Sequence, residues 1–258
     1  MKRYSFSIIA CATLFLFSCS DATDIDQPGR LTERAAFETI DDLEAGLLGT
    51  YGTLDTSSEI QFNAVFTDEV SIGFDNGGQG LGDGTWGFVL NNISAAPTSF
   101  WTGAYAGLNN VNILREAASN YEIQAGEQDQ YNNILGQAYA IRAALHHFIM
   151  TYFSTDLTDD NALAGILLDF VPTPSDQLLR STNAEFYALI QSDLNQAASL
   201  ITGDEGNTFV NDDFVTALRA RVAAYREDYA TAAPLAQSLL NSYPLANRAE
   251  YEGIFLDV

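Results

Sequence analysis

A tryptophan followed closely by two asparagines is the group of residues in this chain best suited to bind a sugar. Trp86 precedes Asn91 and Asn92 by a few residues. A flat indole ring can pack against the C–H face of a pyranose, while amide groups hydrogen-bond the hydroxyls around it. These residue types therefore indicate carbohydrate binding rather than a reaction. The alternative is that Trp86 only anchors its loop on the rest of the fold.

The stretch that carries Trp86 is predicted to be a long loop. Glycines interrupt any regular period between residues 66 and 92, at positions 73, 77, 78, 80, 82, 84 and 87. Long loops that carry aromatic side chains are often binding surfaces. The run from Asp75 to Gly84 resembles a calcium loop in composition, but it lacks the ligand spacing and the terminal glutamate of an EF-hand. We therefore predict no metal there.

No group of residues stands out as catalytic. Glycoside hydrolysis needs two carboxylates that converge across a cleft, and no pair is distinguishable among the 34 acidic residues. Ser181, Ser192 and Ser199 lack the context of a nucleophile elbow. His146 and His147 are adjacent, so they lie on different faces of a helix and are predicted to be packed or solvated. The sequence predicts no enzyme, no metal site and no cofactor.

The first nineteen residues have the layout of a bacterial lipoprotein signal. Lys2 and Arg3 precede an apolar run over residues 8–17, which is too short to span a bilayer, and Ser18-Cys19 follows. We expect residues 1–18 to be removed and Cys19 to carry acyl chains that hold the protein on a membrane. Residues 19–36 then form an acidic, flexible tether. An uncleaved anchor or a plain secretory peptide is the alternative.

The composition limits the partners further. The formal net charge is −23, so nucleic acid and anionic lipid surfaces are poor partners. The two cysteines, Cys11 and Cys19, lie within or at the end of the signal, which leaves no disulfide for the mature protein.

The rest of the chain is predicted to be all-α. Apolar residues recur every three or four positions from Phe37 to Leu54, from Phe100 to Leu114 and from Tyr131 to Tyr152. Thr182 and Glu185 have the spacing of a capping box at the start of a further helix. No alternating strand pattern competes, so we predict an all-α scaffold with long irregular loops.

Two residues on these stripes are interpreted as structural. Trp101 shares a helical face with Tyr105 and Leu108, which favours core packing. Arg142 lies midway along an apolar stripe, so we predict a buried or half-buried cation that pairs with a carboxylate.

The last two helices resemble a tetratricopeptide pair. One runs from about Asp213 to Arg226, and the next covers Tyr229 to Asn241 after a turn at Glu227-Asp228. Small residues at 232, 233 and 236 are expected where the two helices approach closely. No clean repeat period accompanies them.

Several phrases in order resemble the SusD/RagB family of surface nutrient-binding lipoproteins. They are FETIDDLEAGLLGTY at 37–51, WTGAYAGLNNVN at 101–112, GQAYAIRAALHHF at 136–148, Arg180-Ser181-Thr182 with Tyr187, Ile190, Asp193-Leu194 and Ala197, and then Ala217, Ala220-Arg221-Val222, Tyr229 and Ala232. The third fits a family helix of the form G-x-A-x-x-x-R-A. The order of these phrases behind a lipoprotein signal is the specific feature.

The resemblance implies a tetratricopeptide-like scaffold over residues 37–258, with a loop-rich insertion at 55–99. It also implies a non-enzymatic lipoprotein of the outer membrane that faces outward, captures an oligosaccharide and delivers it to a SusC-like, TonB-dependent transporter. Family ligand contacts fall partly in the N-terminal loop, which by approximate position adds Asp68 to Trp86 and Asn91 as candidate ligand-binding residues. Family members usually continue past residue 245 into a region that supplies part of the ligand site. We therefore expect either a short variant or a chain that lacks this C-terminal region.

Two other functions remain open. The acidic residues Asp68, Glu69, Asp75 and Asp83 of the same loop could hold a basic peptide instead of a glycan. Alternatively, the helical repeats could act as an adaptor that binds protein and no small molecule. A lipoprotein glycosidase is a more distant possibility.

Overall fold

The structure is a computed structural model that describes residues 36–54, 56–67, 69–73, 75–79, 86–91, 93–202, 206 and 208–256. The predicted signal peptide, Cys19, the tether up to residue 35, Asp68 and Asn92 lie outside the described residues. Their roles therefore stay predictions.

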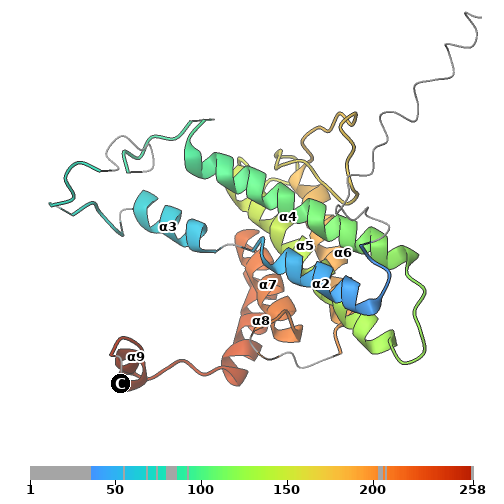
Figure 1. The fold of residues 1–258 in the computed structure, drawn as a ribbon. Coiled ribbons are helices and arrows are strands. Elements are labelled where there is room, and N and C mark those ends of the chain that lie inside the picture. Colours follow the sequence, from blue (N-terminus) through green and yellow to red (C-terminus); the bar gives the residue numbers. More distant parts are fainter. Residues whose placement is uncertain are drawn as a thin grey trace, which may run out of the picture. The chain divides into compact units, whose positions relative to one another are not determined.

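The described residues form eight α-helices and no strand, so the all-α prediction is confirmed (Figure 1). The helices are α2 (Ile40–Tyr51), α3 (Ser57–Phe66), α4 (Ala95–Asn120), α5 (Gln128–Phe153), α6 (Asn183–Leu200), α7 (Asp212–Tyr225), α8 (Tyr229–Ser242) and α9 (Arg248–Ile254).

Local sequence signals explain where several helices begin. Thr182 accepts a hydrogen bond from the backbone N–H of Glu185, and the Glu185 carboxylate accepts one from the backbone N–H of Thr182. This is the predicted capping box, which satisfies backbone groups that the first turn of α6 leaves open. Thr39 and Asp42 form the same arrangement at the start of α2.

Helix α5 lies at the centre of the core. It packs against α2, α4, α6 and α7, and most of its residues from Gly136 to Met150 are buried. Gly136 permits the close approach of α6, because a Cβ atom there would lie 2.7 Å from Ile201 Cγ1 and 3.0 Å from Ile201 N. The glycine of the G-x-A-x-x-x-R-A phrase is thus a packing residue.

The arginine of that phrase is buried as predicted. Arg142 donates two hydrogen bonds to the Asp193 carboxylate of α6, Nε to Oδ2 at 2.7 Å and Nη2 to Oδ1 at 2.6 Å. Its Nη1 lies 3.3 Å from both Asn112 Oδ1 and the carbonyl oxygen of Asp169. The guanidinium therefore joins α4, α5 and α6 to the irregular connector between α5 and α6.

Two further side chains hold this connector. Leu168 N–H donates to His146 Nε2 at 3.3 Å, so the ring proton sits on Nδ1, which lies 3.0 Å from the Arg142 carbonyl. Burial, together with the charge of Arg142, lowers the pKa of His146 to about 3. Tyr105 OH donates to Ile166 O at 3.0 Å and accepts from Ile166 N at 2.6 Å. Buried polar groups thus fix the course of the connector.

Residues 55–99 contain more helix than a loop-rich insertion suggests. Helix α3 occupies Ser57–Phe66, and α4 begins at Ala95. In α3 Val65 is the buried residue, which explains why the sequence shows no helical stripe there. The described residues between 67 and 94 are irregular, as predicted.

Helices α7 and α8 form the predicted antiparallel pair. Glu227 adopts a left-handed φ of 61° in the turn, and Asp228 caps α8 by accepting a hydrogen bond from Thr231 N. Ala232 is buried between the helices. Ala233 and Ala236, which were expected at the same close approach, are exposed, so of the three alanines Ala232 is the one that is buried.

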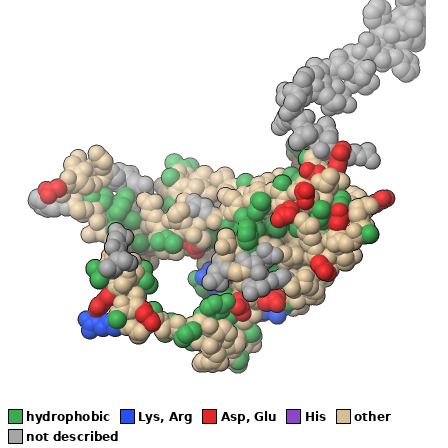
Figure 2. Space-filling view, turned by 60° about the horizontal axis from the view of Figure 1, so that its bottom comes forward, with side chains coloured by type: hydrophobic (Ala, Val, Ile, Leu, Met, Phe, Trp, Pro, Cys, Tyr) green, Lys and Arg blue, Asp and Glu red, His purple; other side chains and the backbone are tan. Residues whose placement is uncertain are grey.

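The surface matches the charge of the sequence. Asp and Glu side chains are spread over the face shown in Figure 2, whereas Lys and Arg side chains are few.

Candidate functional site

The structure describes two of the three predicted ligand-binding residues. Trp86 is half-buried in a turn, and Asn91 is exposed just before α4. Asn91 N donates to Ser94 Oγ at 3.0 Å, and Asn91 Oδ1 accepts from Ile93 N at 2.9 Å. Asn91 therefore shapes the entry into α4, whatever else it binds.

An exposed aromatic residue adjoins this turn. Phe88 has a positive φ of 55° and is 54 % exposed, and its ring lies 6.1 Å from the Phe66 ring at the end of α3. A non-glycine residue in this conformation is uncommon. The turn thus presents a second aromatic side chain close to Trp86, which the sequence reasoning did not single out.

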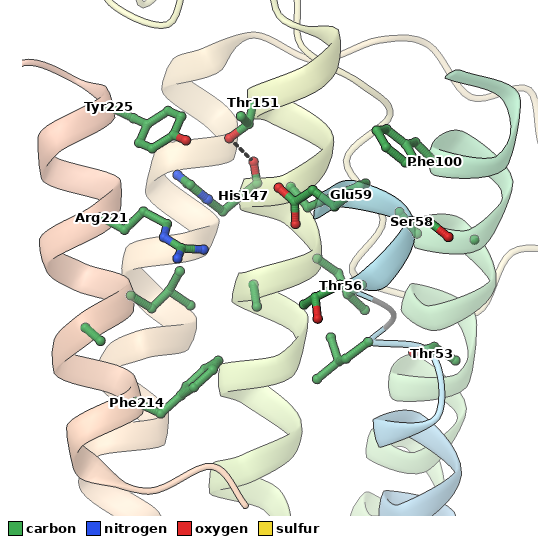
Figure 3. A pocket seen from close by; sticks show the side chains of 18 of the residues that line it. Thr53, Thr56, Ser58, Glu59, Phe100, His147, Thr151, Phe214, Arg221 and Tyr225 are labelled. Atoms are coloured by element: carbon green, nitrogen blue, oxygen red, sulfur yellow. Dashed lines mark hydrogen bonds between the residues drawn. The ribbon is translucent and has the colours of Figure 1, made fainter. Parts of the chain in front are cut away.

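A separate pocket lies between α4, α5 and α7, with α3 contributing to its lining, and has a volume of about 440 Å³ (Figure 3). Its apolar wall is partly aromatic. Phe100 of α4 and Phe148 of α5 pack edge to face with ring centroids 5.2 Å apart, and Phe214 points into the pocket from α7. Such a wall favours an apolar or aromatic ligand surface.

His147 supplies a buried polar group in the pocket. It is 5 % exposed, and its Nε2 atom has no hydrogen-bond partner among the described residues. The Tyr225 ring packs edge-on against the imidazole at 5.2 Å. Burial, aided by the nearby charge of Arg221, lowers the pKa of His147 to about 4, so the ring is neutral at pH 7.

Two charged residues lie on opposite sides of the pocket. Arg221 projects from α7 toward His147, and Glu59 lies on α3 (Figure 3). Glu59 Oε1 accepts a hydrogen bond of 2.7 Å from Tyr152 OH, which in turn accepts one of 2.8 Å from Asn63 Nδ2. Glu59 is therefore fixed by its neighbours.

The lining is mainly apolar, and Glu59 is the one carboxylate among the described residues that line the pocket. The sequence signal for this pocket was weak, because its residues come from four helices that are distant in sequence. The sequence indicates Phe148 only as part of an apolar helical stripe, and Arg221 only as part of a motif shared with the family.

Comparison with known proteins identifies the family. The family model described as "Starch-binding associating with outer membrane", of the SusD-like type, matches residues 57–225, from α3 to the end of α7. The chain belongs to this SusD-like family. The resemblance stated from the sequence is therefore confirmed.

Individual relatives agree with this assignment. The SusD-like protein P2 of Formosa agariphila is 23 % identical over 263 residues, which cover 99 % of this chain and 50 % of the relative. A SusD superfamily structure from Bacteroides vulgatus aligns with a TM-score of 0.70 and 22 % identity, covering 83 % of this chain and 51 % of the other. A laminarin-binding SusD-like protein aligns with a TM-score of 0.64 and 19 % identity, covering 82 % and 46 %.

These matches show the tetratricopeptide-like SusD fold. The chain spans about half the length of these relatives. In the part of the SusD-like chain that the structure describes, no helix is long and apolar enough to cross a membrane.

Proposed function

We propose that this SusD-like protein binds carbohydrate at the outer surface of the cell and delivers it to a SusC-like, TonB-dependent transporter. The observation that carries the proposal is the match of residues 57–225 to a family described as starch-binding and associated with the outer membrane. Cys19 would hold the protein on the outer membrane by lipid, with the domain facing outward. Transport energy would come from the transporter.

The proposed ligand surface is the turn that carries Trp86, together with Asn91 and Asp68. Trp86 is half-buried and Phe88 is largely exposed, so aromatic surface is available for stacking on a sugar ring. Its bonds to Ile93 and Ser94 hold Asn91 in a defined turn, which would present its side-chain amide from a fixed position. Stacking tolerates different sugars, so polar neighbours would set the specificity.

Calorimetric titration of the purified full chain with laminarin and with plant, algal and microbial oligosaccharides tests this function. We expect one glycan class to bind, and Trp86→Ala to weaken its binding at least tenfold. Tyr251→Ala is the matched control, because Tyr251 is an exposed aromatic residue on α9. Undiminished binding by Trp86→Ala would rule out the proposed surface, and a folded protein that binds no glycan would contradict the function.

Anchoring and delivery need separate measurements. Cys19→Ala should move the protein from the membrane fraction to the soluble fraction of cells. Affinity purification of the native protein from outer membranes should recover a TonB-dependent transporter, and recovery of none would contradict delivery.

A further inference from the structure

The pocket between α4, α5 and α7 has features that the proposed glycan surface does not use. Its lining does not include Trp86 or Asn91. Its walls are mainly apolar, and they enclose about 440 Å³, which suits a ring or a short chain of carbon atoms. Sugars carry hydroxyls all around, so a different class of ligand fits these walls better.

His147 gives the first sign of a ligand. Its Nε2 atom is buried and unpartnered among the described residues, and the side chain lines the pocket (Figure 3). Buried polar groups in native proteins almost always have a hydrogen-bond partner, because an unmade bond costs free energy. A neutral imidazole with its proton on Nε2 could donate to an oxygen atom of a bound molecule.

Arg221 gives the second sign. The described residues include seven arginines, and the structure gives a hydrogen bond or an ion pair to six of them: Arg115, Arg142, Arg180, Arg219, Arg226 and Arg248. Arg221 is an exposed residue that lines the pocket and has neither to any described residue, although the chain contains 34 acidic residues against 11 basic ones. A guanidinium that lines a pocket and has no carboxylate partner among the described residues is suited to pair with a carboxylate of a ligand.

Glu59 would orient such a ligand. It lines the opposite side of the pocket and is held by the hydrogen bond from Tyr152. A negative charge on the ligand would be repelled from the α3 side and attracted to the α7 side. The pocket therefore has a polar end at Arg221 and His147 and an apolar body at Phe100, Phe148 and Phe214.

We propose that this pocket binds a small amphipathic carboxylic acid. The carboxylate pairs with Arg221 and accepts a hydrogen bond from His147 Nε2, while the apolar or aromatic body packs against Phe100 and Phe148. This site is distinct from the glycan surface and does not depend on it.

Calorimetry of the full chain with 4-phenylbutyrate, and with 4-phenylbutan-1-ol as a neutral analogue, tests the proposal at pH 7.5. We expect the acid to bind at least tenfold more tightly than the alcohol. Arg221→Gln should abolish this preference, whereas Arg248→Gln, which removes an exposed arginine on α9, should keep it.

A pocket-filling variant provides an independent test. Gly103 lines the pocket, and a Cβ atom there would meet nothing within 4 Å, so Gly103→Leu should fill the pocket without disturbing α4. It should abolish binding of the acid, leave the circular dichroism spectrum intact and not lower the Tm. Gly49→Leu is the matched control, since Gly49 is also in open space on a helix but does not line the pocket.

Three results would overturn the proposal. They are the absence of binding by the acid, equal affinity for the acid and the alcohol in the native protein, and undiminished binding by a folded Gly103→Leu variant.

Discussion

Arg142 of α5 and Asp193 of α6 form a buried bidentate ion pair, with side chains that are 4 % and 1 % exposed. Burial raises the pKa of the Asp193 carboxyl, while the hydrogen bonds from Arg142 act in the opposite direction. Asn112 lies against the same guanidinium and donates to the carbonyl oxygens of Leu168 and Phe170 at 3.0 Å. The pair is thus the centre of the polar network that holds the connector on the bundle.

Removing one member of this pair should destabilise the protein strongly. Arg142→Met leaves the Asp193 carboxylate buried without its partner, for which we expect a loss of about 3–5 kcal/mol in the free energy of unfolding. Urea denaturation followed by circular dichroism measures the change. Arg248→Met is the control, because its pair with Glu252 is exposed and should contribute little.

The double variant Arg142→Met with Asp193→Leu shows whether that loss comes from an uncompensated buried charge or from lost packing. If the cost comes from the uncompensated charge, the double variant should recover much of the stability. Additive losses would show instead that each side chain is needed for packing.

Acid should destabilise the fold through its histidines before the carboxylates titrate. The folded pKa is about 3 for His146 and about 4 for His147, both below the ordinary value of 6.5. Between the folded pKa values and 6.5, the unfolded chain binds protons that the folded chain does not. The stability that the neutral histidines contribute is therefore fully present above pH 6.5 and is lost as the pH falls. By pH 5 each histidine should cost about 2 kcal/mol.

Denaturation midpoints measured from pH 7.5 to pH 5 test this dependence. His146→Gln and His147→Gln should each reduce the pH slope by about half, whatever their effect on stability at pH 7.5. A native protein whose stability is constant over this range would contradict the assignment of two neutral buried histidines.

Replacement by alanine should change stability in opposite directions at two helical glycines, Gly136 and Gly49. Gly136→Ala places a Cβ atom 2.7 Å from Ile201 Cγ1, so we expect a loss of about 1–3 kcal/mol through overpacking. Gly49→Ala meets nothing within 4 Å and should stabilise α2 by about 0.5–1 kcal/mol. Thermal unfolding of the two variants provides the measurement, and a shift of Tm in the same direction would contradict the packing seen at Gly136.

The sequence predicted the parts of the fold that depend on local signals. Apolar stripes predicted α2, α4 and α5, and the spacing of Thr182 and Glu185 predicted the start of α6. Helix α3 was not predicted, because a helix with a single buried residue shows no apolar stripe in the sequence. A buried partner for Arg142 could be expected from its apolar surroundings, but Asp193 could not be chosen over other carboxylates without the packing of α5 on α6.

The candidate site was less accessible from sequence, for a related reason. Trp86 and Asn91 could be proposed because they are neighbours in the chain. The pocket residues His147, Arg221 and Glu59 lie on three helices that are distant in sequence, so only tertiary packing brings them around one space. That Arg221 has no hydrogen bond or ion pair to a described residue can be known only from the structure.

Loss of one hydroxyl should loosen the connector without unfolding the bundle. Tyr105→Phe removes both the donor to Ile166 O and the acceptor for Ile166 N–H, in partly buried surroundings. We expect a loss of about 1–3 kcal/mol, since both backbone groups then lack a partner. Burial raises the pKa of Tyr105 to about 12, so the native phenol remains a donor at neutral pH. Hydrogen exchange should become faster in the peptide around residue 166 and stay unchanged in α8, where no contact depends on Tyr105. An equal increase in both segments would show that Tyr105 stabilises the whole bundle and not the connector alone.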